Sequence, residues 1–158
     1  MNKNEIQLRP ANSLDKKALL ILEQAVVEAE RPFNPQIRSK ACYYDLEDLL
    51  ENDLSHVIVA LHNEEIIATG YVQIRTSKKS LTHNKHGYLG FMFVSPEYRG
   101  HGLNQRIIKT LMNWAESKGI YDFYLDVYKD NEAAIKAYEK LGFEPSLLEM
   151  KVNTEKQV

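Results

Sequence analysis

The run from residue 88 to residue 127 constrains the fold of this 158-residue chain more than any other segment. It begins with Tyr88-Leu89-Gly90-Phe91-Met92-Phe93-Val94, a nearly continuous apolar stretch that is typical of a central strand buried on both faces. A glycine-containing turn follows, and residues 103–117 then repeat apolar side chains at helical spacing. A further strand is predicted at 120–127. Two strands joined by a helix in this way form a parallel pair with a right-handed crossover.

The remaining elements are predicted from periodicity and from turn residues. Strands are expected at four places, which are 6–10, 56–61, 66–74 and 147–152. Helices are expected at three more, which are 14–29, 39–52 and 131–141. The second and third strands should form a hairpin because a short polar link joins them. Ser13 is predicted to cap the first helix, while Asp130 and Gly142 should bracket the last one.

Length and charge limit the classes of protein that this chain can represent. A chain of this size closes one hydrophobic core, and its formal net charge of -2 attracts neither nucleic acid nor anionic membrane. Cys42 is the only cysteine, which precludes an intrachain disulfide and suits a reducing compartment. The first residues lack the apolar core of a signal peptide, and no apolar run approaches the roughly 20 residues of a membrane span. We therefore expect a cytoplasmic protein without nucleic-acid or membrane partners.

The turn after the apolar strand is the most informative local motif, and it reads Val94-Ser95-Pro96-Glu97-Tyr98-Arg99-Gly100-His101-Gly102-Leu103-Asn104. Glycines allow a ligand to approach the backbone closely, and unpaired amides at a helix start attract anions such as pyrophosphate. From the glycines alone, a purely structural turn is equally favoured. A dinucleotide-binding turn would need glycine or alanine at Gln105, and a P-loop would need Gly-Lys-Ser/Thr. The sequence fits neither of these two alternatives.

This turn resembles the acetyl-CoA loop of the GNAT superfamily, whose pattern is Arg or Gln, two residues, Gly, one residue, then Gly or Ala. Asn104 departs from that pattern, because it stands where the family usually has a small residue. A second and independent resemblance is Asn131-Glu132-Ala133-Ala134-Ile135-Lys136-Ala137-Tyr138-Glu139-Lys140-Leu141-Gly142-Phe143, which is similar to the family's Asn-x-x-Ala-x-x-x-Tyr signature. The resemblance covers residues 88–152 well, and it covers the first half only by the order of elements.

The resemblance implies a single α/β domain of GNAT type over residues 1–152. Its sheet would be mixed but mostly antiparallel, with six or seven strands, about four flanking helices and a splayed central parallel pair. Residues 1–85 would shape the acceptor site and residues 86–152 would bind acetyl-CoA, with 153–158 as a C-terminal tail. The family implies an N-acetyltransferase that moves acetyl directly from the thioester to a primary amine, with no covalent enzyme intermediate and no metal.

By the same resemblance, the residues expected to contact acetyl-CoA are Met92, Phe93, Val94, Arg99, Gly100, His101, Gly102, Leu103, Asn104, Asn131 and Tyr138. The amides of Phe93 and Val94 would hold the pantetheine arm, and an amide near Met92 would polarise the thioester carbonyl. Tyr138 would be the general acid for the departing thiolate. Asn131 and Tyr138 are seven residues apart, so they should point from one face of their helix.

Several points stay open at the level of sequence. Tyr88 stands where many relatives carry a glutamate base; His83, His86, Tyr88 and Asp126 are possible proton relays, and none is assigned. An acetyl-CoA-binding regulatory module without turnover is the alternative function. The two histidines lack a third metal ligand nearby, and they are interpreted as structural or solvated. Cys42, predicted to lie on a helix, has no neighbouring histidine that would make it a nucleophile.

The acceptor is not identified by any motif. Residues 23–53 contain eight acids, Glu23, Glu28, Glu30, Asp45, Glu47, Asp48, Glu51 and Asp53, against three bases, Arg31, Arg38 and Lys40. Such a segment could attract a cationic amine, although acidic helices more often present a solvated face. A small-molecule or a protein amine, any acyl-chain preference, and a monomer or a homodimer all remain compatible with the sequence.

Overall fold

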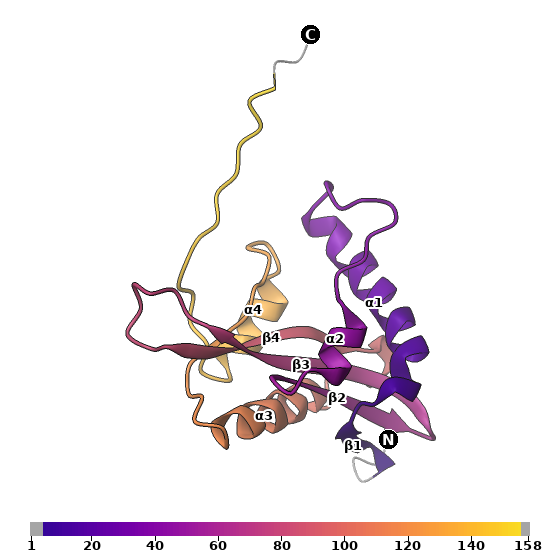
Figure 1. Ribbon diagram of the computed structural model, residues 1–158. Helices are drawn as coiled ribbons and strands as arrows, with labels where there is room; N and C mark the ends of the chain where they lie inside the picture. Colours follow the sequence, from indigo (N-terminus) through magenta and orange to yellow (C-terminus); the bar gives the residue numbers. More distant parts are fainter. Residues whose placement is uncertain (1–4, 156–158) are drawn as a thin grey trace. The chain divides into compact units, whose positions relative to one another are not determined.

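The computed structural model describes residues 5–155, which divide into two compact units after Asp126 (Figure 1). Residues 1–4, and residues 156–158 of the predicted C-terminal tail, lie outside the described residues. Within residues 5–155, none of the helices has the length and apolar character that crossing a bilayer requires.

The first unit is built on a sheet with the strand order β1-β2-β3-β4-β5. Its strands are β1 (Gln7–Pro10), β2 (Ser55–His62), β3 (Glu65–Thr76), β4 (Lys85–Val94) and β5 (Phe123–Tyr124). Its helices are α1 (Lys16–Glu30), α2 (Leu46–Glu51) and α3 (Leu103–Glu116), and α4 (Glu132–Glu139) belongs to the second unit. Neighbouring strands are antiparallel except β4 and β5, which are parallel as predicted from the strand, helix and strand that they form with α3.

The predicted hairpin is confirmed as β2 and β3. Asn63 and Glu64 form its turn, and both have positive φ angles, 50° and 66°. Two-residue hairpin turns favour such angles because their twist matches that of the flanking strands.

The prediction of six or seven strands is wrong for the described residues, which form five. The expected strand at 147–152 is absent, and its apolar side chains are exposed, with Leu147 at 85% and Met150 at 86%. The parallel pair is consequently at the edge of the sheet and not at its centre. Alternating apolar residues favour a strand only where a neighbouring strand can accept the backbone hydrogen bonds, so the pattern alone did not decide the outcome.

The helix predicted over 39–52 is also shorter than expected, because α2 begins only at Leu46. Glu23, fully buried on α1, accepts hydrogen bonds from the backbone amides of Tyr43 (3.0 Å) and Tyr44 (2.8 Å). Amides that donate to this carboxylate are not available for helical hydrogen bonds, so the preceding segment stays non-helical. Cys42 therefore lies in this non-helical segment and not on a helix.

Two predicted helix caps are each wrong by one residue. Asn12, not Ser13, caps the short helical turn before α1, by accepting a hydrogen bond from the Leu14 amide at 2.9 Å. Asn131, not Asp130, caps α4. Asparagine and aspartate are equally good capping residues, so local preference could not choose between the last two.

In the first unit, α3 lies on one face of the sheet, and α1 and α2 lie on the other (Figure 1). A Cβ atom added at Gly70 would lie 3.1 Å from Ile107 of α3, so Gly70 faces that helix. Alternation along β3 then puts Val72 and its partner Leu89 on the same side, which we call the aliphatic face. Both are nearly inaccessible to solvent.

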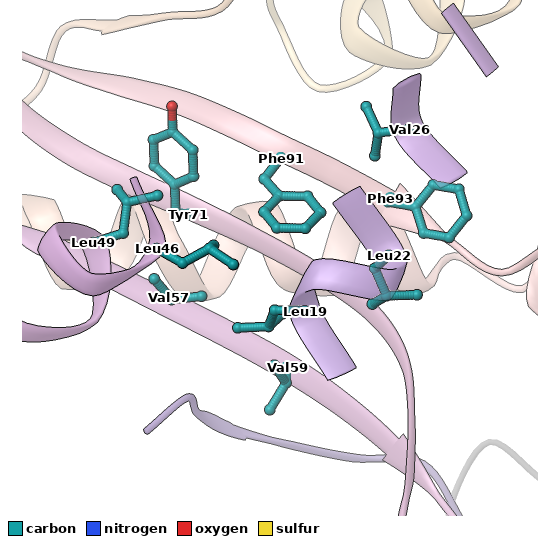
Figure 2. Packing of buried hydrophobic residues seen from close by; sticks show 10 residues of the cluster. All are labelled: Leu19, Leu22, Val26, Leu46, Leu49, Val57, Val59, Tyr71, Phe91 and Phe93. Carbon is teal, nitrogen blue, oxygen red and sulfur yellow. The ribbon is translucent and has the colours of Figure 1, made fainter. Parts of the chain in front are cut away.

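The opposite side, which we call the aromatic face, packs against α1 and α2 (Figure 2). Its buried sheet residues include Tyr71 of β3 and Phe91 and Phe93 of β4. Leu19 and Leu22 of α1 lie against the same cluster. Tyrosines with polar hydroxyl groups are part of this face, and they bring polar atoms to the edge of the core.

Candidate active site

A β-bulge interrupts β4 opposite Gly70. Tyr71 pairs with Gly90 and Thr69 pairs with Phe93, so two residues of β4, Phe91 and Met92, oppose one residue of β3. Phe91 has a φ angle of +53°, which is rare for a bulky side chain. The extra residue shifts the alternation of β4, so that Gly90 and Phe91 both face the aromatic side.

Beyond the bulge, one edge of β4 has no neighbouring strand among the described residues. β5 pairs with β4 only at Gly87 and Tyr88. The Ser95 amide donates to the Ile67 carbonyl of β3 at 2.8 Å. Because successive amides of a strand alternate in direction, Phe93 shares the direction of Ser95, and the amides of Met92 and Val94 face away from β3.

The glycine turn after β4 leads directly into α3. Gly100 and Gly102 have φ angles of +83° and +75°, and no atom lies within 4 Å of the position that a Cβ would take at either residue. Gly102 is the N-cap of α3 and provides no side-chain hydrogen bond, whereas Asp45 and Asn131 cap their helices with side-chain oxygens. Within the described part of the chain, the N-cap of α3 thus offers its first amides no side-chain acceptor, and their partial positive charge is open to an anion.

Neighbouring side chains hold the turn in place. The Arg99 side chain turns back and donates from Nε to the Val94 carbonyl at 2.9 Å. Its Cζ atom lies 5.7 Å from the centre of the Phe93 ring. Tyr98 forms a 2.8 Å hydrogen bond with His62, so the turn is joined to the β2–β3 hairpin as well.

Three further residues predicted from the sequence lie at the start of α3. Leu103 is buried and anchors the helix, whereas His101 is exposed. The side-chain oxygen of Asn104 is buried and has no hydrogen-bond partner among residues 5–155. A buried acceptor without a donor is destabilising, so we expect the Asn104 side chain to rotate when a ligand binds.

The second unit carries the other two predicted contacts. Asn131 accepts a hydrogen bond from the Ala134 amide at 3.3 Å, and its side-chain NH2 group takes no part in this cap. Positions 131, 134, 135 and 138 are partly buried, whereas 132, 133, 136 and 137 are exposed. Asn131 and Tyr138 thus belong to the same side of α4. The Tyr138 ring centre lies 6.0 Å from that of Phe143, in an edge-to-face arrangement.

Aromatic side chains from separate elements gather on the aromatic face. Tyr44 stacks on Phe91 with ring centres 4.4 Å apart, and its ring lies 6.0 Å from Tyr71. Burial raises the pKa values of Tyr44 and Tyr71, so both hydroxyl groups stay neutral. Sequence periodicity could not bring these residues together, because the loop that carries Tyr44 is positioned by buried Glu23.

Tyr88 lies at the edge of this aromatic group and makes a polar contact with the segment after β5. Its hydroxyl group donates to Asp126 Oδ2 at 2.9 Å. Burial and this hydrogen bond both raise the pKa of Tyr88 above its ordinary value. Two of the four possible relays noted in the sequence therefore form one hydrogen-bonded pair.

The other two possible relays, His83 and His86, are joined by a serine that the sequence did not single out. Ser77 Oγ lies 2.6 Å from His83 Nδ1 and 2.9 Å from His86 Nδ1, and His83 Nε2 is 2.8 Å from the Tyr124 hydroxyl. Burial lowers the pKa of His86. Of the two interpretations of this pair, structural or solvated, the structural one agrees with these contacts, since both rings belong to a network that ties the β3–β4 loop to β5.

The acidic segment 23–53 is less open to cations than its composition suggested. Glu23 is buried and satisfied by backbone amides. Glu28 and Glu47 form ion pairs at 2.9 and 2.7 Å with Arg31 and Lys16. Burial also raises the pKa of Glu30, which reduces its tendency to carry charge. Several of the eight acids therefore have structural partners.

The comparisons with known proteins agree with this arrangement. The chain is 38% identical over 60 residues to the uncharacterized N-acetyltransferase YobR of Bacillus subtilis strain 168, a match that covers 38% of this chain and 24% of YobR. The chain thus matches about a quarter of that relative's length.

Two solved structures share the fold. A predicted acetyltransferase from Clostridium acetobutylicum, determined with acetyl-CoA, has a TM-score of 0.75 at 22% identity, covering 94% of this chain and 96% of the other. A mutant of the BH1408 protein from Bacillus halodurans has a TM-score of 0.84 at 20% identity, covering 94% and 99%. The model of the acetyltransferase (GNAT) family matches residues 23–143, well over half of the sequence. The chain therefore belongs to the GNAT acetyltransferase family, for which acetyl-CoA is the typical co-substrate.

Proposed function

We propose that this chain is an acetyl-CoA-dependent N-acetyltransferase that passes the acetyl group directly from the thioester to a primary amine. One observation carries the proposal most strongly, namely the path formed by the unpaired edge of β4, the glycine turn and the start of α3, whose N-cap Gly102 provides no side-chain hydrogen bond. Family membership makes acetyl-CoA the natural occupant of that path.

The glycine turn fits the pyrophosphate of CoA. The backbone around Gly100 and Gly102 is open to close approach. The amides of His101, Leu103 and Asn104, in the turn and at the helix start, would donate hydrogen bonds to the phosphate oxygens. A phosphate oxygen can only accept hydrogen bonds, so the side chain of Asn104 would present its NH2 group and not its oxygen.

On β4, we assign the donor amides to Met92 and Val94. Amides that face away from β3 can bind the pantetheine arm as a neighbouring strand would, and the Met92 amide would polarise the thioester carbonyl. Phe93 contributes through its ring, which lies under Arg99. Arg99 in turn keeps the end of β4 attached to the turn.

In the second unit, Asn131 would donate from its free NH2 group to the CoA arm while its oxygen caps α4. Tyr138 would supply the proton for the leaving thiolate. In this scheme the lone pair of the amine attacks the carbonyl carbon and the C–S bond breaks. The sulfur takes a proton from the Tyr138 hydroxyl, and the amine gives up one proton to a base.

The test begins with thermal unfolding in the presence of acetyl-CoA, CoA, NADH and ATP. We expect the two CoA compounds alone to raise the melting temperature, because a ligand that binds only the folded state stabilises it. Thiol release is then followed across a panel of alkyl and aryl amines. No stabilisation by acetyl-CoA would overturn the proposal.

The variant Tyr138→Phe should keep the acetyl-CoA stabilisation and lose turnover by roughly 10- to 1000-fold, as expected for the loss of a general acid. Tyr121→Phe removes a hydroxyl group from an exposed tyrosine of the first unit and is the matched control. Equal turnover in the two variants would exclude Tyr138 as the acid.

A regulatory module that binds acetyl-CoA without turnover is the second candidate. It is favoured by Tyr88, since a phenol with a raised pKa is a poor substitute for a glutamate base. Binding of acetyl-CoA without thiol release over the whole amine panel would support it.

A further inference from the structure

The transferase reaction needs a proton acceptor, and Tyr88, at the position where many relatives carry a glutamate base, does not provide one. An alkyl amine has a pKa of about 10.4 and arrives at neutral pH as an ammonium ion, so a proton must leave as the amide forms. Tyr88 occupies the expected position, but its hydroxyl group already donates to Asp126. A phenol that donates its proton to a carboxylate does not accept another one from the substrate.

The hydroxyl group of Tyr88 contacts the carboxylate of Asp126, which therefore lies beside the position where many relatives carry the base. Tyr88 is the last residue of β4 that pairs with β5, through Tyr124, and Asp126 follows two residues later. The β4 edge that carries the Met92 and Val94 amides begins directly after this pair. Asp126 thus lies just after β5, near the proposed thioester path and at the point where β4 and β5 separate.

Asp126 is also available to a substrate. Its side chain is exposed, and Tyr88 engages only one of its two oxygens. No ion pair links it to a cation within the described residues 5–155. The other charged or titratable groups around the Tyr88–Asp126 pair are Tyr71, whose ring lies 6.5 Å from that of Tyr88, and Arg75, whose Cζ lies 4.0 Å above the Tyr88 ring.

The histidines are less suited to this role. Both Nδ1 atoms are within hydrogen-bond distance of Ser77, and His83 Nε2 is engaged by Tyr124. These contacts occupy three of the four ring nitrogens of the pair. The second carboxylate oxygen of Asp126 is not used by Tyr88. This oxygen can accept a hydrogen bond from an ammonium ion, and the negative charge of the carboxylate attracts that ion.

We propose that Asp126 attracts the acceptor as an alkylammonium ion and takes the proton that the neutral amine loses as it attacks the thioester, while Tyr88 is a positioning residue that holds the carboxylate. This assignment rests on the proposed transferase function and names its acceptor class and its base.

The proton and electron balance sets the order of events. An alkylammonium ion does not give its proton to a carboxylate in a free equilibrium, because its pKa is far higher. The ammonium ion, which has no lone pair, therefore first loses one proton to solvent water. As the lone pair of the resulting neutral amine forms the bond to the carbonyl carbon, its N–H becomes acidic and a second proton passes to the free oxygen of Asp126. The C–S bond breaks, and Tyr138 protonates the sulfur.

The central test is Asp126→Asn, which keeps a side-chain oxygen for the Tyr88 hydroxyl and removes the charge. With n-butylamine we expect kcat/KM at pH 7 to fall by about 10²- to 10⁴-fold, the range for lost general-base catalysis. The deficit should shrink as the pH approaches about 10, where the amine is neutral without help. Aniline, which is neutral at pH 7, should lose much less.

A binding measurement separates recognition from chemistry. Titration of n-butylamine into the protein with CoA, which cannot react, should give at least about tenfold weaker binding for Asp126→Asn than for the wild type. Asp122→Asn removes the same charge from an exposed aspartate four residues earlier and should match the wild type. Stabilisation by acetyl-CoA should be the same in all three proteins.

Tyr88→Phe tests the positioning role. We expect an approximately 3- to 30-fold loss of kcat/KM for n-butylamine and a much smaller loss for aniline, because the carboxylate that attracts the ammonium ion has lost the hydroxyl group that holds it. A merely structural role would lower kcat/KM for the two amines equally.

Two results would overturn the assignment to Asp126. One is wild-type amine binding and a wild-type pH profile in Asp126→Asn. The other is an equal loss with n-butylamine and aniline. Failure of the transferase function itself would be recognised differently, by the absence of acetyl-CoA stabilisation and of thiol release in the wild type, whereas dependence of n-butylamine binding on Asp126 would still support the amine site.

Discussion

The two faces of the first-unit sheet are made by the same strands but differ in chemistry. On the aliphatic face, Ile107, Ile108 and Leu111 of α3 are completely buried, and they pack against a side that includes Val72 and Leu89. The aromatic face carries tyrosine hydroxyl groups and ends at the exposed Asp126 carboxylate. The comparison indicates that one face mainly stabilises the fold, while the other can bind and react.

The largest expected effect lies on the aliphatic face. Ile107→Ala would leave a cavity where the side chain has no solvent exposure, and we expect the free energy of unfolding to fall by about 2–5 kcal/mol. Denaturant titration measures this loss. Turnover per folded molecule should be unchanged, and a lower turnover in the folded fraction would break the division between the faces.

An intermediate effect is expected at Glu23, beneath the aromatic face. Glu23→Gln keeps a carbonyl oxygen for the Tyr43 and Tyr44 amides but replaces two charge-assisted hydrogen bonds with neutral ones. We expect a loss of about 1–2 kcal/mol in the free energy of unfolding. Because Tyr44 packs on Phe91 and Tyr71, the KM for the amine should rise more than the KM for acetyl-CoA. Equal changes in both constants would argue against an acceptor role for this face.

The smallest effect concerns acid stability. His56 stacks on Trp114 of α3, and burial followed by the charge of Lys118 lowers its pKa below 6.5. The unfolded chain therefore binds the proton more tightly, so the contribution of His56 to stability is complete above pH 6.5 and is lost as the pH falls through that value.

Urea titrations between pH 8 and pH 5 would follow this loss. His56→Phe should flatten the dependence only in part, since burial also lowers the pKa of His86 on the side of the aromatic face. Complete flattening would mean that the histidine network there contributes nothing to acid sensitivity.

Local sequence patterns predicted much of the fold. The β2–β3 hairpin, α3 and the parallel pair depend on short-range periodicity and on turn residues, and they are present. The glycine turn was likewise readable, because positive φ angles at Gly100 and Gly102 need residues without a side chain.

What could not be predicted depends on contacts between distant residues. Buried Glu23 delays the start of the helix predicted over 39–52, from a position 20 residues before Tyr43. Asp126 meets Tyr88 only because two strands pair in parallel, and no local pattern marks an aspartate in such a position. The predicted strand at 147–152 shows the converse, a good local pattern without a partner.

The bulge at Phe91 changes which residues of β4, even-numbered or odd-numbered, face the aromatic side. Before it, even-numbered residues such as Tyr88 face the aromatic side, and after it, odd-numbered residues such as Phe93 do. A deletion of Phe91 would remove the bulge but leave Phe93 opposite Thr69 and Val94 opposite Ala68, so the Val94 amide would still face away from β3. The extra residue therefore adds one aromatic ring beside Tyr44 without changing how the end of β4 pairs with β3.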